Sequence, residues 1–154
     1  MTAGSAEQLL QRPAQLRQAG RVIEAIAAYE QLLALRPDLP DSWYNLGWLR
    51  RQARRFPEAL EAYREALRRG VGGPEEVHLN RAVILGDHLG RPAEAQAELE
   101  AALKLNPRYV PALLNLGSKA RVRFSRTLMS GTMPSSLRSS VQNPMPARMA
   151  SAGA

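Results

Sequence analysis

The sequence predicts an all-α protein in which short helix pairs repeat along the chain. Three observations predict this fold. The sequence overlays on itself with a period of about 34 residues, so that Ala25 falls on Ala59 and Tyr29 on Tyr63. Apolar residues in these segments recur every three or four positions, as they do along one face of a helix. Glycine and proline separate the segments, as in "GVGGP" at residues 70–74, where a helix is expected to end.

Each repeat is expected to hold two helices. In the segment 40–74, Trp43 and Leu46 have the spacing of two apolar anchors on a first helix. Pro57 suits the first turn of a second helix, because a proline there gives up an N–H group that has no partner within the helix. The small side chains of Gly47 and Ala59 should let the paired helices approach closely, with Tyr63 filling the space between them.

The repeat extends along most of the chain. A further shift of 36 places Ala59 on Ala95, and a shift of 70 places residues 45–47 on residues 115–117, both "NLG". Four units follow, at about 6–39, 40–74, 75–109 and 110–127, after an N-terminal tail at 1–5. The two extra residues of the third spacing are expected in connections, one near "GVGGP" and one near "DHLGR".

The pattern of Trp43, Leu46 and Gly47, followed by Ala59 and Tyr63, resembles the tetratricopeptide repeat (TPR), a helix pair with a period of about 34 residues. The resemblance covers about residues 6–117. It implies a right-handed α-solenoid of about three helix pairs plus a capping helix. Two departures stand out: Arg50 occupies a position where the family usually has tyrosine, and Arg12-Pro13 stands where Leu-Gly is expected.

The charge of the chain is distributed unevenly. Residues 1–117 hold 15 basic and 14 acidic residues, whereas residues 118–154 hold six basic residues and no acidic one. The net charge of +7 therefore arises almost wholly in the C-terminal segment, and the repeat body lacks the basic surface expected of a nucleic-acid binder. No apolar run reaches the ~18 residues of a membrane span. Cysteine is absent, which excludes disulfides and thiolate metal sites, and the N-terminus does not resemble a secretory signal. We expect a cytoplasmic protein.

The family resemblance implies that the first helices line a concave groove in which a protein or peptide partner binds. Tyr44, Trp48 and Arg51 share one helix face, and these residue types are typical of binding hot spots. The alternative is that Tyr44 and Trp48 pack on the neighbouring unit. An asparagine recurs at one position of three first helices, and its amide can both donate to and accept from a peptide backbone, although it is also a consensus residue without that role. The predicted groove residues are Tyr44, Asn45, Trp48, Arg51, Leu79, Asn80, Val83 and Asn115.

No pattern in the sequence indicates catalysis. His78 and His88 are ten residues apart and have no ligand-spaced partner. Glu61 and Glu65 stand beside arginines at helical spacing, which indicates ion pairs on a helix surface. The glycines of "GVGGP" lack the lysine of a phosphate-binding loop. We therefore predict a protein that is not an enzyme and that needs no cofactor or metal.

The composition changes abruptly at Ser118. Eight serines and four of the five methionines fall within residues 118–154. Helix is expected to continue to about residue 127 and to cap the stack, whereas residues 128–154 are expected to form a disordered basic tail rich in Ser, Met and Pro. Two explanations remain open. The tail is either a selected extension that binds an acidic partner or a membrane surface, or the product of a frame shift near codon 117.

Residues 75–117 are also similar to the repeat region that precedes the catalytic domain in bacterial TPR-sulfotransferase proteins. That resemblance implies a second hypothesis, in which the chain is the N-terminal part of a larger enzyme and has no activity of its own. A third hypothesis is an adaptor that binds acidic surfaces through the basic tail. The first and preferred hypothesis is a protein-interaction module that binds a peptide or protein segment in the groove.

Overall fold

The computed structural model describes residues 3–118, which contain helices and no strand. Residues 3–116 belong to one compact unit. The elements in chain order are α1 (Ala3–Gln18), α2 (Val22–Leu35), α3 (Pro40–Gln52), α4 (Phe56–Arg68), α5 (Pro74–Val83), a π-helical segment η1 (Ile84–His88) and α6 (Pro92–Leu105). Residues 110–118 form a further helix.

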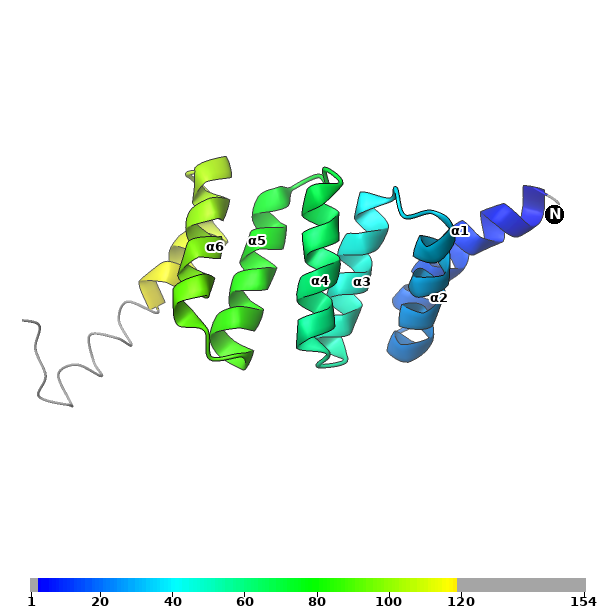
Figure 1. Ribbon diagram of the computed structural model, residues 1–154, viewed down its shortest axis with the longest axis horizontal. Coiled ribbons are helices and arrows are strands. Elements are labelled where there is room, and N and C mark those ends of the chain that lie inside the picture. The colour runs from blue at the N-terminus through cyan, green and yellow to red at the C-terminus, as the bar shows by residue number, and fades with distance from the viewer. Residues whose placement is uncertain (1–2, 119–154) are drawn as a thin grey trace, which may run out of the picture. The chain divides into compact units, whose positions relative to one another are not determined.

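The helices pack as consecutive antiparallel pairs. Within each pair the first helix contacts the second, as α1 contacts α2, α3 contacts α4, and α5 contacts α6. The second helix of one pair then contacts the first helix of the next, so that α2 packs on α3 and α4 on α5 (Figure 1). This arrangement confirms the predicted all-α solenoid of three pairs followed by one more helix.

The first helix begins earlier in the chain than the sequence predicted. α1 begins at Ala3, within the segment 1–5 that the sequence analysis assigned to an N-terminal tail. At the other end the structure describes helix up to residue 118. The rest of the predicted capping helix, and the predicted tail at 128–154, lie outside the described residues.

Proline and glycine set the helix boundaries. α3, α4, α5 and α6 each have a proline at the first or second position, where the lost N–H costs no intrahelical bond. The turn inside each pair contains one residue with positive φ, which is Gly20 (72°), Arg54 (60°) or Gly90 (62°). Glycine adopts this conformation without strain, whereas Arg54 adopts it at a cost.

The close approach within the second pair depends on Gly47. A Cβ atom built on Gly47 would lie 2.8 Å from both Cδ1 and Cε1 of Tyr63, whose ring is fully buried. The sequence prediction that a small residue at position 47 seats the Tyr63 ring is therefore confirmed. In the third pair Ala82 and Leu99 occupy the corresponding positions, and both are fully buried in one cluster.

The third pair accommodates its extra residue near "DHLGR" as π-helix. In the first two pairs the turn is closed by a bond from an N–H to a carbonyl five residues earlier, Arg21 to Leu16 and Arg55 to Arg50. In the third pair the corresponding bond, from Arg91 to Leu85, spans six residues. The additional residue belongs to η1, whose wider turns absorb it. The expectation that this residue lengthens a connection is thus wrong, since it is taken up within the helical segment.

Candidate functional site

The eight predicted groove residues lie on three helices. Those on α3 (Tyr44, Asn45, Trp48 and Arg51) are all half-buried. On α5, Leu79 and Val83 are half-buried and Asn80 is buried, while Asn115 is half-buried on the helix 110–118. Tyr44 and Arg51 are hydrogen-bonded to residues of α5, whereas Asn45 faces Tyr29 of the first pair. We call the surface formed by Arg17, Tyr44, Asn45, Trp48, Arg51 and Asn80 the first-helix surface.

Tyr44 connects α3 to the next pair. Its hydroxyl donates a hydrogen bond of 2.7 Å to Oε1 of Glu76, in the first turn of α5. Its ring centroid lies 5.8 Å from that of Tyr63, with the rings tilted by 51°. Burial raises the pKa of Tyr44 well above its usual range, and the hydrogen bond to Glu76 raises it further. Tyr44 therefore remains a hydrogen-bond donor at neutral pH and serves both as a packing residue and as a link between units.

Arg51 makes the second connection between α3 and α5. Its guanidinium donates to Oδ1 of Asn80 over 2.6 Å, and Nδ2 of Asn80 donates to the backbone carbonyl of Glu76 over 3.0 Å. Both ends of the Asn80 amide are thus engaged within the chain. Each end uses one of the two bonds that it can form, but Asn80 is only 8% exposed, so little of this amide is accessible to a peptide.

A related arrangement occurs one unit earlier, around Arg17. Arg17 of α1 and Asn45 of α3 both lie close to the hydroxyl of Tyr29, whose side chain is buried. Burial raises the pKa of Tyr29, and the contacts with Arg17 and Asn45 partly offset this effect. The sequence analysis did not include Arg17 among the groove residues. The shift by one repeat that overlays Ala25 on Ala59 could have identified it, because the same shift places Arg17 on Arg51.

Trp48 lies on α3 between Asn45 and Arg51. Part of its side chain packs on the cluster formed by α2 and α3, which includes Leu32 and Leu49. The side chain is half-buried, so the remaining part is accessible to solvent. Packing on the neighbouring unit, which the sequence analysis kept as an alternative, therefore accounts for some of the Trp48 surface and leaves the rest for a partner.

The other polar residues that the sequence singled out have structural partners. His78 Nδ1 lies 2.6 Å from Oε2 of Glu98, and Arg81 binds the other oxygen of the same carboxylate over 2.8 Å. The ring of His88 stacks on Phe56 with centroids 4.2 Å apart. Arg50, which stands where the family usually has tyrosine, pairs with Glu30 of α2 over 3.2 Å.

A family model described as tetratricopeptide repeat matches residues 15–85 and 88–121. The chain belongs to the tetratricopeptide repeat family. The search among curated proteins gave no match. Among solved structures, the first TPR of Spaghetti (RPAP3) bound to the HSP90 peptide SRMEEVD is similar at 19% identity with a TM-score of 0.66, covering 79% of this chain and 95% of that one.

Two further solved structures share the TPR fold with this chain. The type III secretion chaperone SycD of Yersinia enterocolitica, in complex with a peptide of the translocator YopD, has 18% identity and a TM-score of 0.62, covering 85% of this chain and 98% of that one. The Arabidopsis OM64 TPR domain has 18% identity and a TM-score of 0.62, covering 72% and 90%. At these identities the likeness establishes the TPR fold alone.

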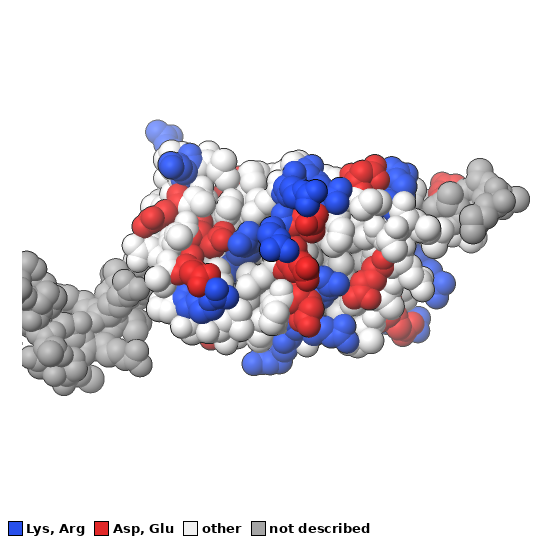
Figure 2. All heavy atoms as spheres, viewed as in Figure 1, with Lys and Arg blue, Asp and Glu red and all other residues white. Residues whose placement is uncertain are grey.

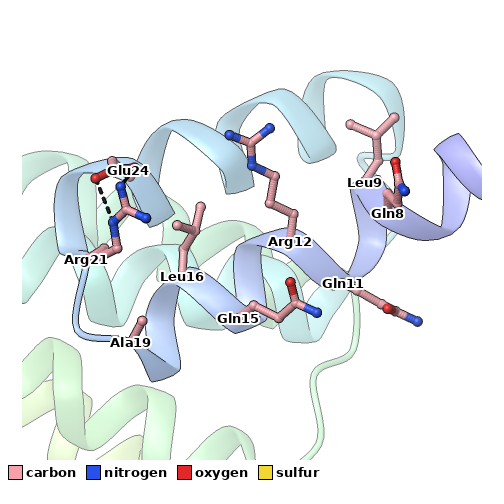
Figure 3. Close-up of a pocket in the computed structure, with 9 residues that line it drawn as sticks. All are labelled: Gln8, Leu9, Gln11, Arg12, Gln15, Leu16, Ala19, Arg21 and Glu24. Atoms are coloured by element: carbon pink, nitrogen blue, oxygen red, sulfur yellow. Dashed lines mark hydrogen bonds and ion pairs between the residues drawn. The ribbon is translucent and has the colours of Figure 1, made fainter.

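A depression of about 820 Å³ lies along α1. It is lined by Gln8, Leu9, Gln11, Arg12, Gln15, Leu16, Ala19, Arg21 and Glu24 (Figure 3). The shift by one repeat places Arg12 and Gln15 on Leu46 and Leu49, which α3 buries against α2. Arg12 and Gln15 therefore make this face of α1 polar, where α3 presents two buried leucines.

The surface seen in Figure 2 carries acidic and basic side chains intermixed. On α4, for example, Arg64 lies 3.8 Å from Glu61, and Arg68 lies 3.6 Å from Glu65. These contacts confirm the predicted ion pairs along the helix surface. Within residues 3–118, none of the helices is both long enough and apolar enough to span a membrane.

Proposed function

We propose that this TPR protein binds a peptide or protein segment at its first-helix surface. The observation that carries the proposal is the convergence of polar and aromatic side chains from three successive first helices. Arg17 of α1 and Asn45 of α3 meet at one tyrosine hydroxyl, and Arg51 of α3 meets Asn80 of α5. Trp48 stands between the two contacts along α3.

The chemistry of this surface suits a peptide. A half-buried tryptophan offers apolar area to a partner, and tryptophan and arginine are enriched among the residues that contribute most to binding. The asparagine and arginine side chains supply both acceptors and donors for a peptide backbone. The solved TPR structures of RPAP3 and SycD, each with a bound peptide, support the proposal as examples of the fold in use.

The two tryptophans of the chain provide a matched test. Trp43 packs between α3 and its neighbours, and its Nε1 donates to the carbonyl of Pro37 over 2.9 Å. Trp48→Ala should therefore keep the helical circular dichroism of the native protein, whereas Trp43→Ala should lower the melting temperature strongly. Peptides that bind the native chain in an array would be remeasured by fluorescence anisotropy against Trp48→Ala.

We expect Trp48→Ala to weaken peptide binding by at least tenfold, the effect of losing about 1.4 kcal/mol or more at a hot spot. If Trp48→Ala stays folded and binds the same peptides as tightly as the native chain, the first-helix surface is not the binding site. If it unfolds, Trp48 is a core residue and the proposal loses its main aromatic contact.

The other two sequence-based hypotheses stay predictions. A basic adaptor would act through residues 118–154, and truncation after Gly117 tests it, because loss of polyanion binding is expected only if the tail is responsible. The similarity to the repeat region of TPR-sulfotransferases concerns a longer protein. The nucleotide sequence tests it, because another reading frame downstream of codon 117 should encode further helix pairs.

A further inference from the structure

The helix at residues 110–118 has one packed face and one open face. On the packed face, Ala112 is fully buried in a cluster with residues of α6. On the open face, three large apolar side chains are exposed to solvent, Val110 by 58%, Leu113 by 47% and Leu114 by 67%. Their spacing of three and four residues places them on one side of a helix. We call these three residues the fourth-unit face.

The second unit shows what covers such a face. A shift of 70 places Trp43 on Leu113. Trp43 packs against the cluster that contains the buried Tyr63 of α4, the second helix of its pair. The glycine that admits the Tyr63 ring recurs as well, because "NLG" at 45–47 is repeated at 115–117. The first helix of the fourth unit therefore carries the residues that receive a second helix.

The sequence after residue 118 lacks the pattern of that second helix. The segment equivalent to α4 is 126–138, which reads "RTLMSGTMPSSLR". Gly131 and Pro134 fall in the interior of this segment. Glycine at such a position weakens a helix, and proline interrupts it. The occupant of the fourth-unit face is therefore expected to come from another chain.

The charge around the fourth-unit face indicates the chemistry of the partner. From residue 101 onward the chain carries eight basic residues and no acidic one. Two of them are exposed within the described part of the chain, Lys104 in the last turn of α6 and Arg108 in the turn before the helix 110–118. A second copy of this chain would bring the same basic segment to the contact, and like charges repel each other. A partner with acidic side chains complements this charge.

We propose that the fourth-unit face binds an acidic amphipathic helix of a partner protein, which takes the position of the second helix of the fourth pair. The apolar stripe of the partner helix would cover Leu113 and Leu114, and its acidic side chains would lie beside Lys104 and Arg108. Clustered exposed apolar side chains of this kind mark contact surfaces. The fourth-unit face shares no residue with the first-helix surface, so this inference is independent of the function proposed above.

The test uses the full chain and peptides that copy α4, because α4 already fits the first helix of its own pair. The template is the sequence 56–69, "FPEALEAYREALRR". Three fluorescein-labelled peptides keep its uncharged residues and carry glutamate, glutamine or lysine at every charged position. A fourth peptide has the composition of the glutamate peptide in scrambled order, so that it keeps the charge and loses the apolar stripe. Fluorescence anisotropy measures each affinity, and circular dichroism measures the helix that forms on binding.

We expect the glutamate peptide to gain helix on binding and to bind at least tenfold more tightly than the glutamine, lysine and scrambled peptides. Its advantage over the glutamine peptide should shrink as salt rises. Leu113→Gln and Leu114→Gln should each weaken the glutamate peptide about tenfold, as expected for a central interface residue. Leu35→Gln is the matched control, because Leu35 is 65% exposed and lies on α2. Circular dichroism melts establish that each variant is folded.

The scrambled peptide controls for simple attraction to the basic residues after Gly117, because it carries the same charge as the glutamate peptide. Trp48→Ala controls for binding at the first-helix surface, and this variant should bind the glutamate peptide as tightly as the native chain does. If Trp48→Ala weakens that peptide, the peptide binds at the first-helix surface and the fourth-unit face is not its site.

Four further outcomes overturn the inference. In the first, Leu113→Gln and Leu114→Gln bind the glutamate peptide as tightly as Leu35→Gln does. In the second, the glutamine or the scrambled peptide binds as tightly as the glutamate peptide, so that either the acidic charge or the apolar stripe is irrelevant. In the third, no peptide binds and Leu113→Gln lowers the melting temperature far more than Leu35→Gln does, so that the chain covers the face itself. In the fourth, sedimentation velocity shows a dimer that Leu113→Gln dissociates, so that a second copy is the occupant.

Discussion

The contact between Gly47 and Tyr63 allows a quantitative prediction about the substitution Gly47→Ala. The added methyl group would lie 2.8 Å from two carbons of the Tyr63 ring. Because that ring is fully buried, it cannot swing into solvent to make room. Overpacking of this kind costs about 1–3 kcal/mol, whereas alanine gains about 1 kcal/mol over glycine in a helix interior. We therefore expect a net loss of about 1 kcal/mol in the free energy of unfolding.

A double-mutant cycle separates these two effects. The third pair already combines Ala82 with Leu99 at the corresponding positions, so Tyr63→Leu together with Gly47→Ala copies a combination that the chain tolerates. In the Tyr63→Leu background the methyl group has space, and Gly47→Ala should stabilise the protein by up to about 1 kcal/mol through helix propensity. Urea denaturation of the four proteins, followed by circular dichroism, measures each free energy.

The reasoning requires a coupling energy of about 1–3 kcal/mol between positions 47 and 63, the size of the overpacking cost itself. Independent sites add within ~0.5 kcal/mol. A coupling energy below that value would show that the added methyl group does not meet the ring, and the account of why glycine stands at position 47 would be wrong. Equal urea m-values across the four proteins would establish that they unfold between comparable states.

Arg54→Gly should raise the free energy of unfolding by about 1 kcal/mol in urea denaturation, because Arg54 has φ of 60° at the turn position where glycine stands in the other pairs; an unchanged or lower stability would contradict this. Glu98→Gln should destabilise the protein by about 1–3 kcal/mol, since it removes the negative charge that pairs with the half-buried Arg81 and contacts His78, whereas Glu61→Gln on the surface should change stability by less than about 1 kcal/mol. The native pKa of Tyr44 lies above its value in the unfolded chain, so this residue stabilises the fold below pH ~10 and the contribution is lost as pH rises beyond it; Tyr44→Phe should make the alkaline loss of stability less steep, and an identical pH profile would refute the assignment.

The sequence predicted what depends on local spacing. The period of the repeat, the helix starts at proline and the small residue at position 47 each follow from chemistry within one unit, and the structure agrees with them. The bond from Arg51 to Asn80 was not predicted, because it depends on the offset between first helices of different units, which no local pattern encodes. The role of Arg17 was missed for a related reason. Its unit departs from the repeat pattern nearby, at Arg12-Pro13, and this departure obscures the equivalence of Arg17 with Arg51.

Where the second and third pairs differ in sequence, several residues that contact one another differ together. In the second pair, Trp43, Leu46 and Ala62 form part of one apolar cluster. In the third pair the equivalent positions hold His78, Arg81 and Glu98, which form a polar cluster joined by contacts of 2.6 and 2.8 Å to the Glu98 carboxylate.

Either set of three side chains, the apolar one or the polar one, packs at this contact between helices. A mixture of the two sets would not. A lone carboxylate at the position of Ala62 would be buried without a cation, and a leucine in place of Arg81 would leave part of the charge on Glu98 unbalanced. Taken one position at a time, His78 and Arg81 are therefore two separate departures from the repeat pattern. In three dimensions they are one replacement of an apolar contact by a polar contact, and this explains why the third pair keeps the fold while its sequence diverges from the second.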